Sequence, residues 1–484
     1  MLKDADALPQ LIGEYKPLDQ WQTHLNQLFY GLRGDQLRSY YQTFASADFR
    51  LAHALAADYY ERVTKRDAIT KRPPSTVNHP SSLPLTPHPL PLTVLELGPG
   101  NGNLAACFLS HLKVLDKEGT VYSRVRYVMV DWEESMLAGA LAHPDLAAHR
   151  DRVDIHCGSV EQVVQVAEGT VDRIFCNELW NDLPTKLMAK HGGEFEEEYL
   201  RPNLSESLHA KIHDWSAFVR AFQEKHLATL KTFPPFLDEL VWEKEYRNVE
   251  WKDVSYRKTI VEFLQAIDQD VLVPVNVGAF STLKEAKRLL APDAIGFSAF
   301  DAGTGDMNVL NDPEKPCYGQ FGGQYSFMVN FALIQAVAKQ LGFKHTTVEL
   351  QREFVGRSLN TNAITLMDLL ATHPTAGPKL QPWEQDRLVL KTIRALNETY
   401  ESPYRRRLEF PLGATIPPEE REALGAILRS LKDNGIPDTV AYLTEEELFH
   451  AQSNLEEIGY ETEAITMALN APPSPIEYCR FDCR

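Results

Sequence analysis

Leu92-Thr-Val-Leu-Glu-Leu-Gly-Pro-Gly-Asn-Gly-Asn-Leu104 has the pattern of a buried strand that runs into a tight, glycine-rich turn and then opens a helix. Three glycines in five residues supply the positive φ values and the close backbone approach that such a turn needs. The amide groups at the start of the next helix then face whatever lies above the strand. The stretch predicts a nucleotide-type site in an α/β fold.

The acidic residue Glu96 lies at the end of this strand. A carboxylate there repels a pyrophosphate, but it suits the cationic sulfonium and α-amine of S-adenosylmethionine. We therefore predict S-adenosylmethionine rather than NAD as the cofactor. A glycine turn also occurs in strand-to-helix connections that bind no ligand, so the rest of the chain has to support the prediction.

Strand and helix patterns alternate after the turn, which predicts a doubly wound, Rossmann-like α/β sheet. The predicted strands of this sheet cover residues 92–96, 124–131, 152–160, 171–176, 294–301 and 344–350. Ligands of such sheets bind beyond the carboxyl ends of the strands. Asp131 ends the second strand, where a carboxylate accepts the ribose hydroxyls of an adenosine, and the end of the third strand is expected beside the adenine. The predicted cofactor-binding residues are Glu96, Gly98, Gly100, Asn101, Gly102, Asp131, Trp132, Gly158, Ser159, Val160 and Asn177.

Two carboxylates, Glu178 and Asp182, follow the fourth strand. Because they are four residues apart in an expected loop, both can point into the site, hold a guanidinium or an amine, and take up its proton. We predict them as the catalytic residues. Asp182 would equally suit a structural role as the cap of the turn before Pro184. The histidines are isolated in the sequence, and we predict no metal site.

The 484 residues exceed the size of one hydrophobic core, so we expect several parts. The predicted parts are a helical N-terminal cap (1–65), a proline-rich linker (66–91), a main domain (92–380) with an insertion at about 191–274 that covers the site, and a C-terminal helical region (381–484).

The formal net charge of −18 disfavours a non-specific grip on nucleic acid or anionic lipid. No apolar run approaches the length of a membrane-spanning helix. Six widely spaced cysteines do not form a disulfide framework, which together with the absence of a secretory signal predicts a cytoplasmic protein. We expect a protein or a small molecule as partner, no nucleic acid and no membrane span, and we leave a homodimer open.

The motifs together resemble a known family. The glycine turn after Glu96, the acidic end of the second strand and above all Asn177-Glu-Leu-Trp-Asn-Asp-Leu-Pro184 are similar to the MidA-like class I methyltransferases. The resemblance runs from about Asp48 to Leu350. The family includes a mitochondrial arginine methyltransferase that assists complex I assembly. The resemblance implies a class I methyltransferase fold and S-adenosyl-L-methionine as cofactor.

The leading hypothesis is an S-adenosylmethionine-dependent methyltransferase that acts on an arginine or another nitrogen nucleophile of a protein. Two alternatives stay open. One is a small-molecule O- or N-methyltransferase, and the other is an inactive protein of this fold that works in assembly or binding.

Overall fold

The structure of the chain is a computed structural model. It describes residues 10–33, 48–70, 91–267, 270–377, 379–405, 410, 412–413, 416–432, 441–472 and 474–484. Most of the predicted proline-rich linker, residues 71–90, lies outside the described residues, and its first residues continue a helix to Thr70.

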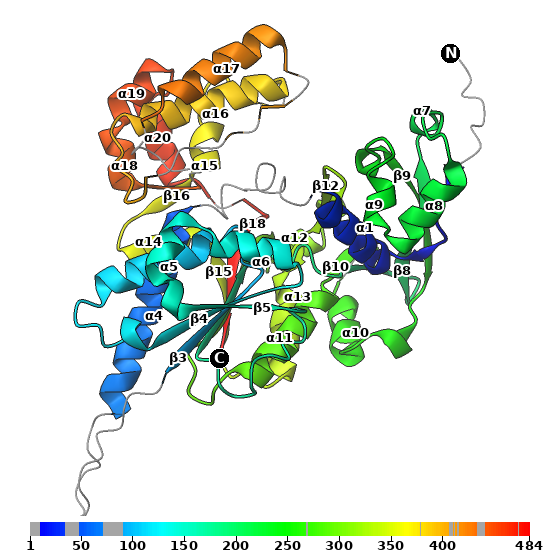
Figure 1. Cartoon of the computed structure of the whole chain (residues 1–484), viewed down its shortest axis with the longest axis horizontal. Coiled ribbons are helices and arrows are strands. Elements are labelled where there is room, and N and C mark those ends of the chain that lie inside the picture. Colours follow the sequence, from blue (N-terminus) through cyan, green and yellow to red (C-terminus); the bar gives the residue numbers. More distant parts are fainter. Residues whose placement is uncertain are drawn as a thin grey trace, which may run out of the picture.

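The centre of the molecule is an eight-stranded sheet (Figure 1). Its strand order is β15-β18-β11-β6-β3-β4-β5, and β14 pairs with β11. The strands are β3 (Leu92–Leu97), β4 (Val125–Asp131), β5 (Val153–Cys157), β6 (Arg173–Asn177), β11 (Gly296–Thr304), β14 (Val329–Asn330), β15 (Thr346–Leu350) and β18 (Glu477–Cys483). Strands β5, β4, β3, β6 and β11 are parallel neighbours, so their carboxyl ends meet at one rim. The predicted Rossmann-like class I fold is confirmed.

Helices cover both faces of this sheet because its strands are apolar on both sides. One face packs against α4 (Phe49–Thr70) and α5 (Asn103–Leu115). The other packs against α11 (Val277–Leu289) and α13 (Phe331–Gln340). Strand β3 contributes Val94 to the first core and Leu95 to the second, as the two-residue period of a strand requires. The glycine turn is thus held between two packed layers.

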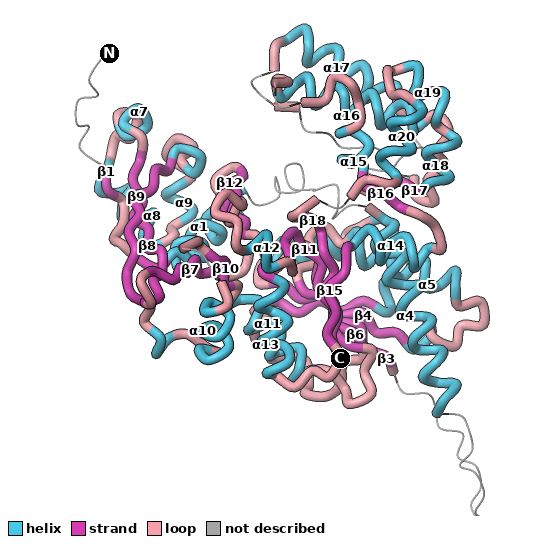
Figure 2. Tube along the Cα trace, turned by 180° about the vertical axis from the view of Figure 1, so that it is seen from behind, coloured by secondary structure: helices cyan, strands magenta, loops and turns pink. Residues whose placement is uncertain are grey.

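The assignment of residues 381–484 to a C-terminal helical region is wrong for its last part. Residues 477–483 form β18, which lies antiparallel between β11 and β15. Residues 351–476, which we call the helical segment, therefore separate two neighbouring strands of the sheet. Figure 2 shows most of this segment as helices grouped beside the sheet.

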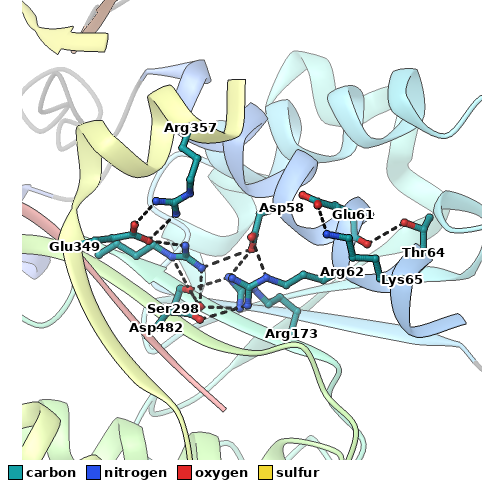
Figure 3. A network of polar contacts seen from close by, with 11 residues as sticks. Asp58, Glu61, Arg62, Thr64, Lys65, Arg173, Ser298, Glu349, Arg357 and Asp482 are labelled. Atoms are coloured by element: carbon teal, nitrogen blue, oxygen red, sulfur yellow. Dashed lines mark hydrogen bonds and ion pairs between the residues drawn. The ribbon is translucent and has the colours of Figure 1, made fainter. Parts of the chain in front are cut away.

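Strand β18 was not predicted because charged residues interrupt its apolar pattern, and these charged side chains are buried or mostly buried. Figure 3 shows the network that accommodates them, with residues from the neighbouring strands β6, β11 and β15 and from α4. The Asp482 carboxylate accepts hydrogen bonds from Ser298 Oγ (2.6 Å), Arg480 Nη2 (2.7 Å) and Arg173 Nη1 (3.3 Å). Arg480 also pairs with Glu349 of β15 at 2.9 Å. Because partners on β6, β11 and β15 bind these charged side chains, a segment that looks polar in the sequence can lie inside the sheet.

The insertion, residues 186–275, forms a second sheet that the sequence patterns did not indicate. Its strands are β7 (Lys186–His191), β8 (Glu194–Leu204), β9 (Leu240–Asn248) and β10 (Val273–Val275), joined by β1 (Gln10–Leu11) and β2 (Lys16–Pro17). The helices of the insertion are α7 (Glu206–His209), α8 (Trp215–Glu224), α9 (Leu227–Leu230) and α10 (Arg257–Gln265).

The expectation of one helical N-terminal cap needs a correction. Helix α1 (Leu18–Arg33) packs on the insertion through Trp21 and Phe29, whereas α4 packs on the central sheet. Residues 34–47, between the two helices, lie outside the described residues. The two helices belong to different cores, so they do not form a single cap over the site.

The remaining elements are mostly short. Those before the helical segment are α6 (Glu134–Leu141), α12 (Met307–Leu310), β12 (Tyr318–Phe321), β13 (Gln324–Phe327) and the 3-10 helices Tyr122–Arg124, Pro144–Arg152, Leu237–Glu239 and Trp251–Asp253. The helical segment holds α14 (Gln351–Leu359), β16 (Ala363–Thr365), α15 (Leu366–Ala371), α16 (Pro382–Asn397), α17 (Pro418–Ser430), β17 (Tyr442–Thr444), α18 (Glu445–His450), α19 (Gln452–Glu457) and α20 (Thr462–Leu469). Across the described ranges, no helix is both long and apolar enough to cross a bilayer.

Candidate functional site

The glycine turn lies at the carboxyl end of β3, and its three glycines have positive φ angles of 69°, 53° and 82° at Gly98, Gly100 and Gly102. A Cβ atom at Gly102 would lie 2.5 Å from the carbonyl oxygen of Ala140, so this glycine lets α6 approach the turn. A Cβ atom at Gly100 would meet no atom within 4 Å. Gly102 therefore serves packing, and Gly100 borders open space where a ligand can approach the backbone.

We expect different effects from alanine at these two glycines. Gly102→Ala clashes with backbone and should lower the free energy of unfolding by about 2 kcal/mol or more. Gly100→Ala should cost only about 1 kcal/mol of backbone strain, but should weaken cofactor binding. Urea unfolding and calorimetry with S-adenosylhomocysteine measure the two effects. Unchanged affinity in Gly100→Ala would mean that the cofactor does not contact this part of the turn.

Asn101 shapes the start of the helix. Its Oδ1 accepts the backbone N–H of Asn103 at 3.0 Å, and the Gly98 amide donates to the Val130 carbonyl at 2.9 Å. The second bond ties the turn to β4. The turn is thus fixed from both sides before any ligand binds.

The side chain of Glu96 contacts the neighbouring strand β4. Its carboxylate is buried beneath α5 and accepts a 2.8 Å hydrogen bond from the Tyr127 hydroxyl. Burial raises the pKa of Glu96 to about 7. A direct contact of Glu96 with the cofactor stays a prediction, and in this structure the side chain links β3 to β4.

Asp131 lies at the end of β4, where its Oδ1 accepts the Glu133 backbone N–H at 3.0 Å. Burial raises the pKa of Asp131 to about 6. The next residue, Trp132, is 46% exposed, and its ring meets Tyr30 of α1 edge-on with 6.4 Å between the centroids. The expected ribose acceptor therefore lies beside an aromatic side chain that is open to solvent.

The loop after β5 follows the same rim. The Gly158 amide donates to the Asp131 carbonyl at 2.8 Å, and Ser159 Oγ accepts the Glu161 backbone N–H at 3.1 Å. The side chain of Val160 is buried in the core with Val163. Only the backbone of Val160 is thus left for a contact with a ligand above the rim.

Asn177 ends β6 next to the glycine strand. Its Oδ1 is buried and has no hydrogen-bond partner, and the same holds for Oδ1 of Asn181 in the following loop. A buried acceptor without a donor costs about 1–3 kcal/mol. The side-chain oxygens of Asn177 and Asn181 can therefore accept hydrogen bonds from donor groups of a bound molecule.

The two predicted catalytic carboxylates lie in this loop. Glu178 has a left-handed backbone with φ of 50°, and its amide donates to the Phe300 carbonyl at 2.8 Å. The Asp182 carboxylate accepts the Tyr30 hydroxyl at 2.6 Å and Gln324 Nε2 at 2.5 Å. Burial and then the negative charge of Glu178 raise the pKa of Asp182 to about 7. The structure brings the two carboxylates into electrostatic contact.

A third carboxylate, Asp301 on β11, joins them. It is fully buried, and its Oδ2 accepts the Asn181 backbone N–H at 3.0 Å. Burial raises the pKa of Asp301 well above its ordinary value, and the charges of Glu178 and Asp182 raise it further. We call Glu178, Asp182 and Asp301 the carboxylate cluster. In the described part of the chain, no group of three such side chains has a geometry that could hold a metal ion.

Sequence reasoning did not include Asp301, Tyr30 and Gln324 among the site residues. Asp301 had a signal, because it follows a run of apolar residues as Glu96 and Asp131 do. The sequence contains no comparable signal for Tyr30 and Gln324, since both lie more than 140 residues from Asp182 along the chain. Their Asp182 contacts come from tertiary packing alone.

Residues 83–253 match the model of a protein family described as "Putative S-adenosyl-L-methionine-dependent methyltransferase". The matched range contains the glycine turn, Asp131, Glu178 and Asp182. Among proteins of curated function, none matches the sequence significantly.

Several solved structures are similar to this chain. An uncharacterized protein from Burkholderia thailandensis is 15% identical, with a TM-score of 0.46 over 79% of this chain and 83% of that chain. A "likely methyl transferase" from the same organism, bound to S-adenosyl-homocysteine, is 14% identical, with a TM-score of 0.44 over 79% and 84%. A SAM dependent methyltransferase from Aquifex aeolicus is 11% identical, with a TM-score of 0.25 over 53% and 74%.

The family match agrees with the resemblance drawn from the motifs, which is thereby confirmed. S-adenosyl-L-methionine is the cofactor of this family, so the cofactor predicted from the turn is confirmed as well. Residues 83–253 therefore match a family of S-adenosyl-L-methionine-dependent methyltransferases, in agreement with the resemblance of the motifs.

Proposed function

We propose that the protein methylates a nitrogen nucleophile, an arginine or another nitrogen of a protein, with Glu178 and Asp182 as the catalytic pair. The observation that carries the proposal is the carboxylate cluster at the rim next to the glycine turn. Carboxylates pair with a guanidinium through two parallel hydrogen bonds, which makes arginine their best-matched side chain.

The residues of the rim fit the cofactor. Gly100 borders open space, which lets a ligand approach the backbone, and Asn177 Oδ1 is a buried acceptor that suits an amine. Asp131 ends β4, where it would accept ribose hydroxyls. These three residues would hold S-adenosylmethionine, which supplies an electrophilic methyl group and keeps the carbon–sulfur bonding electrons on its sulfur.

The protein itself has to orient the nucleophile and remove its proton. Glu178 is the base in this proposal, because the left-handed turn after β6 carries it to the rim. With its pKa of about 7, Asp182 can share a proton near neutral pH, which reduces the repulsion within the carboxylate cluster. A cationic acceptor would replace that proton and leave both carboxylates charged around the nitrogen.

The test is methyl transfer to defined peptides. The protein is incubated with isotope-labelled S-adenosylmethionine and matched peptides that contain arginine, lysine or neither, and mass spectrometry locates the label. We expect label on arginine. Label only on small molecules would redirect the proposal to a small-molecule enzyme. If the folded protein bound neither S-adenosylmethionine nor S-adenosylhomocysteine in calorimetry, every enzymatic version would fail.

Asp131→Ala should weaken cofactor binding at least tenfold, since it removes the acceptor expected to bind two ribose hydroxyls. Calorimetry with S-adenosylhomocysteine measures the change. The control is Asp154→Ala on the neighbouring strand β5, whose partner Arg126 is exposed, and this variant should bind normally. Equal affinities of the two variants would show that the ribose acceptor lies elsewhere.

A further inference from the structure

The last strand of the sheet enters the site from an unexpected direction. Strand β18 is antiparallel to β11, with Tyr478 opposite Ala302 and Asp301 opposite Cys479. The beginning of β18 therefore lies at the rim where the parallel strands end. Tyr478 is the second residue of β18, so its side chain starts beside the carboxylate cluster.

The Tyr478 hydroxyl donates a short hydrogen bond to Oε1 of Glu178, across 300 residues of sequence. Burial and the Glu178 charge both raise the pKa of Tyr478, so the phenol keeps its proton and remains a donor. A charge-assisted hydrogen bond of this kind fixes the orientation of a carboxylate and favours its charged form.

The backbone conformation of Glu178 explains why its carboxylate needs a partner that fixes its orientation. A non-glycine residue in the left-handed region is strained by about 1 kcal/mol or more, and neighbouring contacts have to hold it. The amide is held by Phe300 of β11, and the carboxylate is held by Tyr478 of β18. The two strands thus fix opposite ends of the same residue.

The helical segment supports this arrangement. Tyr442 of β17 lies within electrostatic reach of Glu178, and its backbone N–H donates to Asp48 Oδ2 at 3.0 Å. Arg50 pairs with Asp48 and with Glu447 of α18. These contacts attach the helical segment to the beginning of α4, close to the rim.

We propose that Tyr478 is a positioning residue, which holds the Glu178 carboxylate in its charged form and in the orientation needed to accept a proton from the methyl acceptor. The inference rests on the proposed catalytic role of Glu178. It assigns a part in catalysis to the strand that follows the helical segment, outside residues 83–253. Among the described residues, the ionisable groups in electrostatic contact with Glu178 include Asp182, Asp301, Tyr442 and Tyr478.

The test compares Tyr478→Phe with Tyr460→Phe. The control tyrosine is buried in the helical segment, where its hydroxyl shares a 2.8 Å hydrogen bond with Thr392. Each variant therefore loses one buried hydroxyl and its hydrogen bond. For each protein we would measure kcat/KM against pH with an arginine peptide, the affinity for S-adenosylhomocysteine and the thermal midpoint.

In Tyr478→Phe, we expect the acidic limb of the kcat/KM profile to move up by about one pH unit, because the carboxylate loses a charge-assisted donor. S-adenosylhomocysteine should bind within about twofold of the wild-type affinity. Tyr460→Phe should lower the thermal midpoint to a similar extent and leave the profile in place. An unshifted profile in Tyr478→Phe would overturn the inference, as would an equal shift in both variants.

The role of Tyr478 can be tested separately from methyl transfer. If the wild-type protein transfers no methyl group, the proposal of methyl transfer fails, and the position of Glu178 can still be tested by carbon-13 NMR of labelled glutamate. The Glu178 signal is identified by its loss in Glu178→Gln. A higher titration midpoint of that signal in Tyr478→Phe supports the role of the tyrosine, and an unchanged midpoint contradicts it.

Discussion

Glu178→Gln should lower kcat about 10²- to 10⁴-fold, which is the usual contribution of a positioned base. Glutamine keeps the shape of the side chain and still accepts the Tyr478 hydrogen bond, but it cannot take up a proton. The affinity for S-adenosylmethionine should stay within about twofold, because the change removes none of the predicted cofactor contacts. Steady-state kinetics and calorimetry measure the two quantities on the same protein.

The matched control is Glu196→Gln, the same chemical change at a half-buried carboxylate on β8 of the insertion. This variant should keep full activity. If Glu178→Gln retained the wild-type kcat, Glu178 would not be the base of the reaction. A loss of cofactor affinity parallel to the loss of kcat would assign Glu178 to binding instead.

The largest expected effect on stability comes from Asp482→Ala. The substitution leaves Arg173 and Arg480 buried without the carboxylate that hydrogen-bonds to both, and only the longer ion pairs of Asp58 still reach both arginines (Figure 3). A broken buried pair costs about 3–5 kcal/mol. Urea unfolding followed by circular dichroism measures the loss. Asp482→Asn serves as a milder variant if the alanine protein fails to fold, because the amide oxygen still accepts the Ser298 hydrogen bond.

The control and the pH dependence make the prediction specific. Asp154→Ala removes a salt bridge to a half-exposed arginine and should cost less than about 1 kcal/mol. Although burial opposes it, the charges of Arg173, Arg480 and Arg62 hold the pKa of Asp482 well below its ordinary value. Its stabilisation is therefore present above the ordinary pKa of about 4 and is lost as the pH falls. The difference in the free energy of unfolding between wild type and Asp482→Ala should decrease below about pH 4. An increase of this difference at low pH would contradict the role given to Asp482.

The parallel strands could be predicted because each is a short apolar run that local patterns reveal. Strand β18 could not, since its Arg480 and Asp482 look like solvent-exposed residues until their partners on β6, β11 and β15 are known. The second sheet was missed for a related reason. Every residue of β9 except Leu240 is at least partly exposed, so the strand shows no clear apolar core pattern.

The same limit applies to the site. Glu178 and Asp182 could be found because they follow a predicted strand within one loop. The groups that fix their carboxylates, Tyr30, Gln324 and Tyr478, come from three other elements. No local periodicity links residues that meet only through tertiary packing, so sequence reasoning finds the carboxylates and misses their hydrogen-bond donors.

The position of the helical segment has a consequence for the order of folding. Leu350 and Cys479 are paired residues on neighbouring strands, yet residues 351–478, which include the whole helical segment, lie between them along the chain. Closing a loop of that length costs entropy before any contact is gained, and contacts of such high sequence separation slow folding. If the helical segment folds first, its two ends come close together and the loop is effectively short. We therefore expect the parallel strands and the helical segment to form early, and the sheet to be completed in a late step that also brings Tyr478 to Glu178.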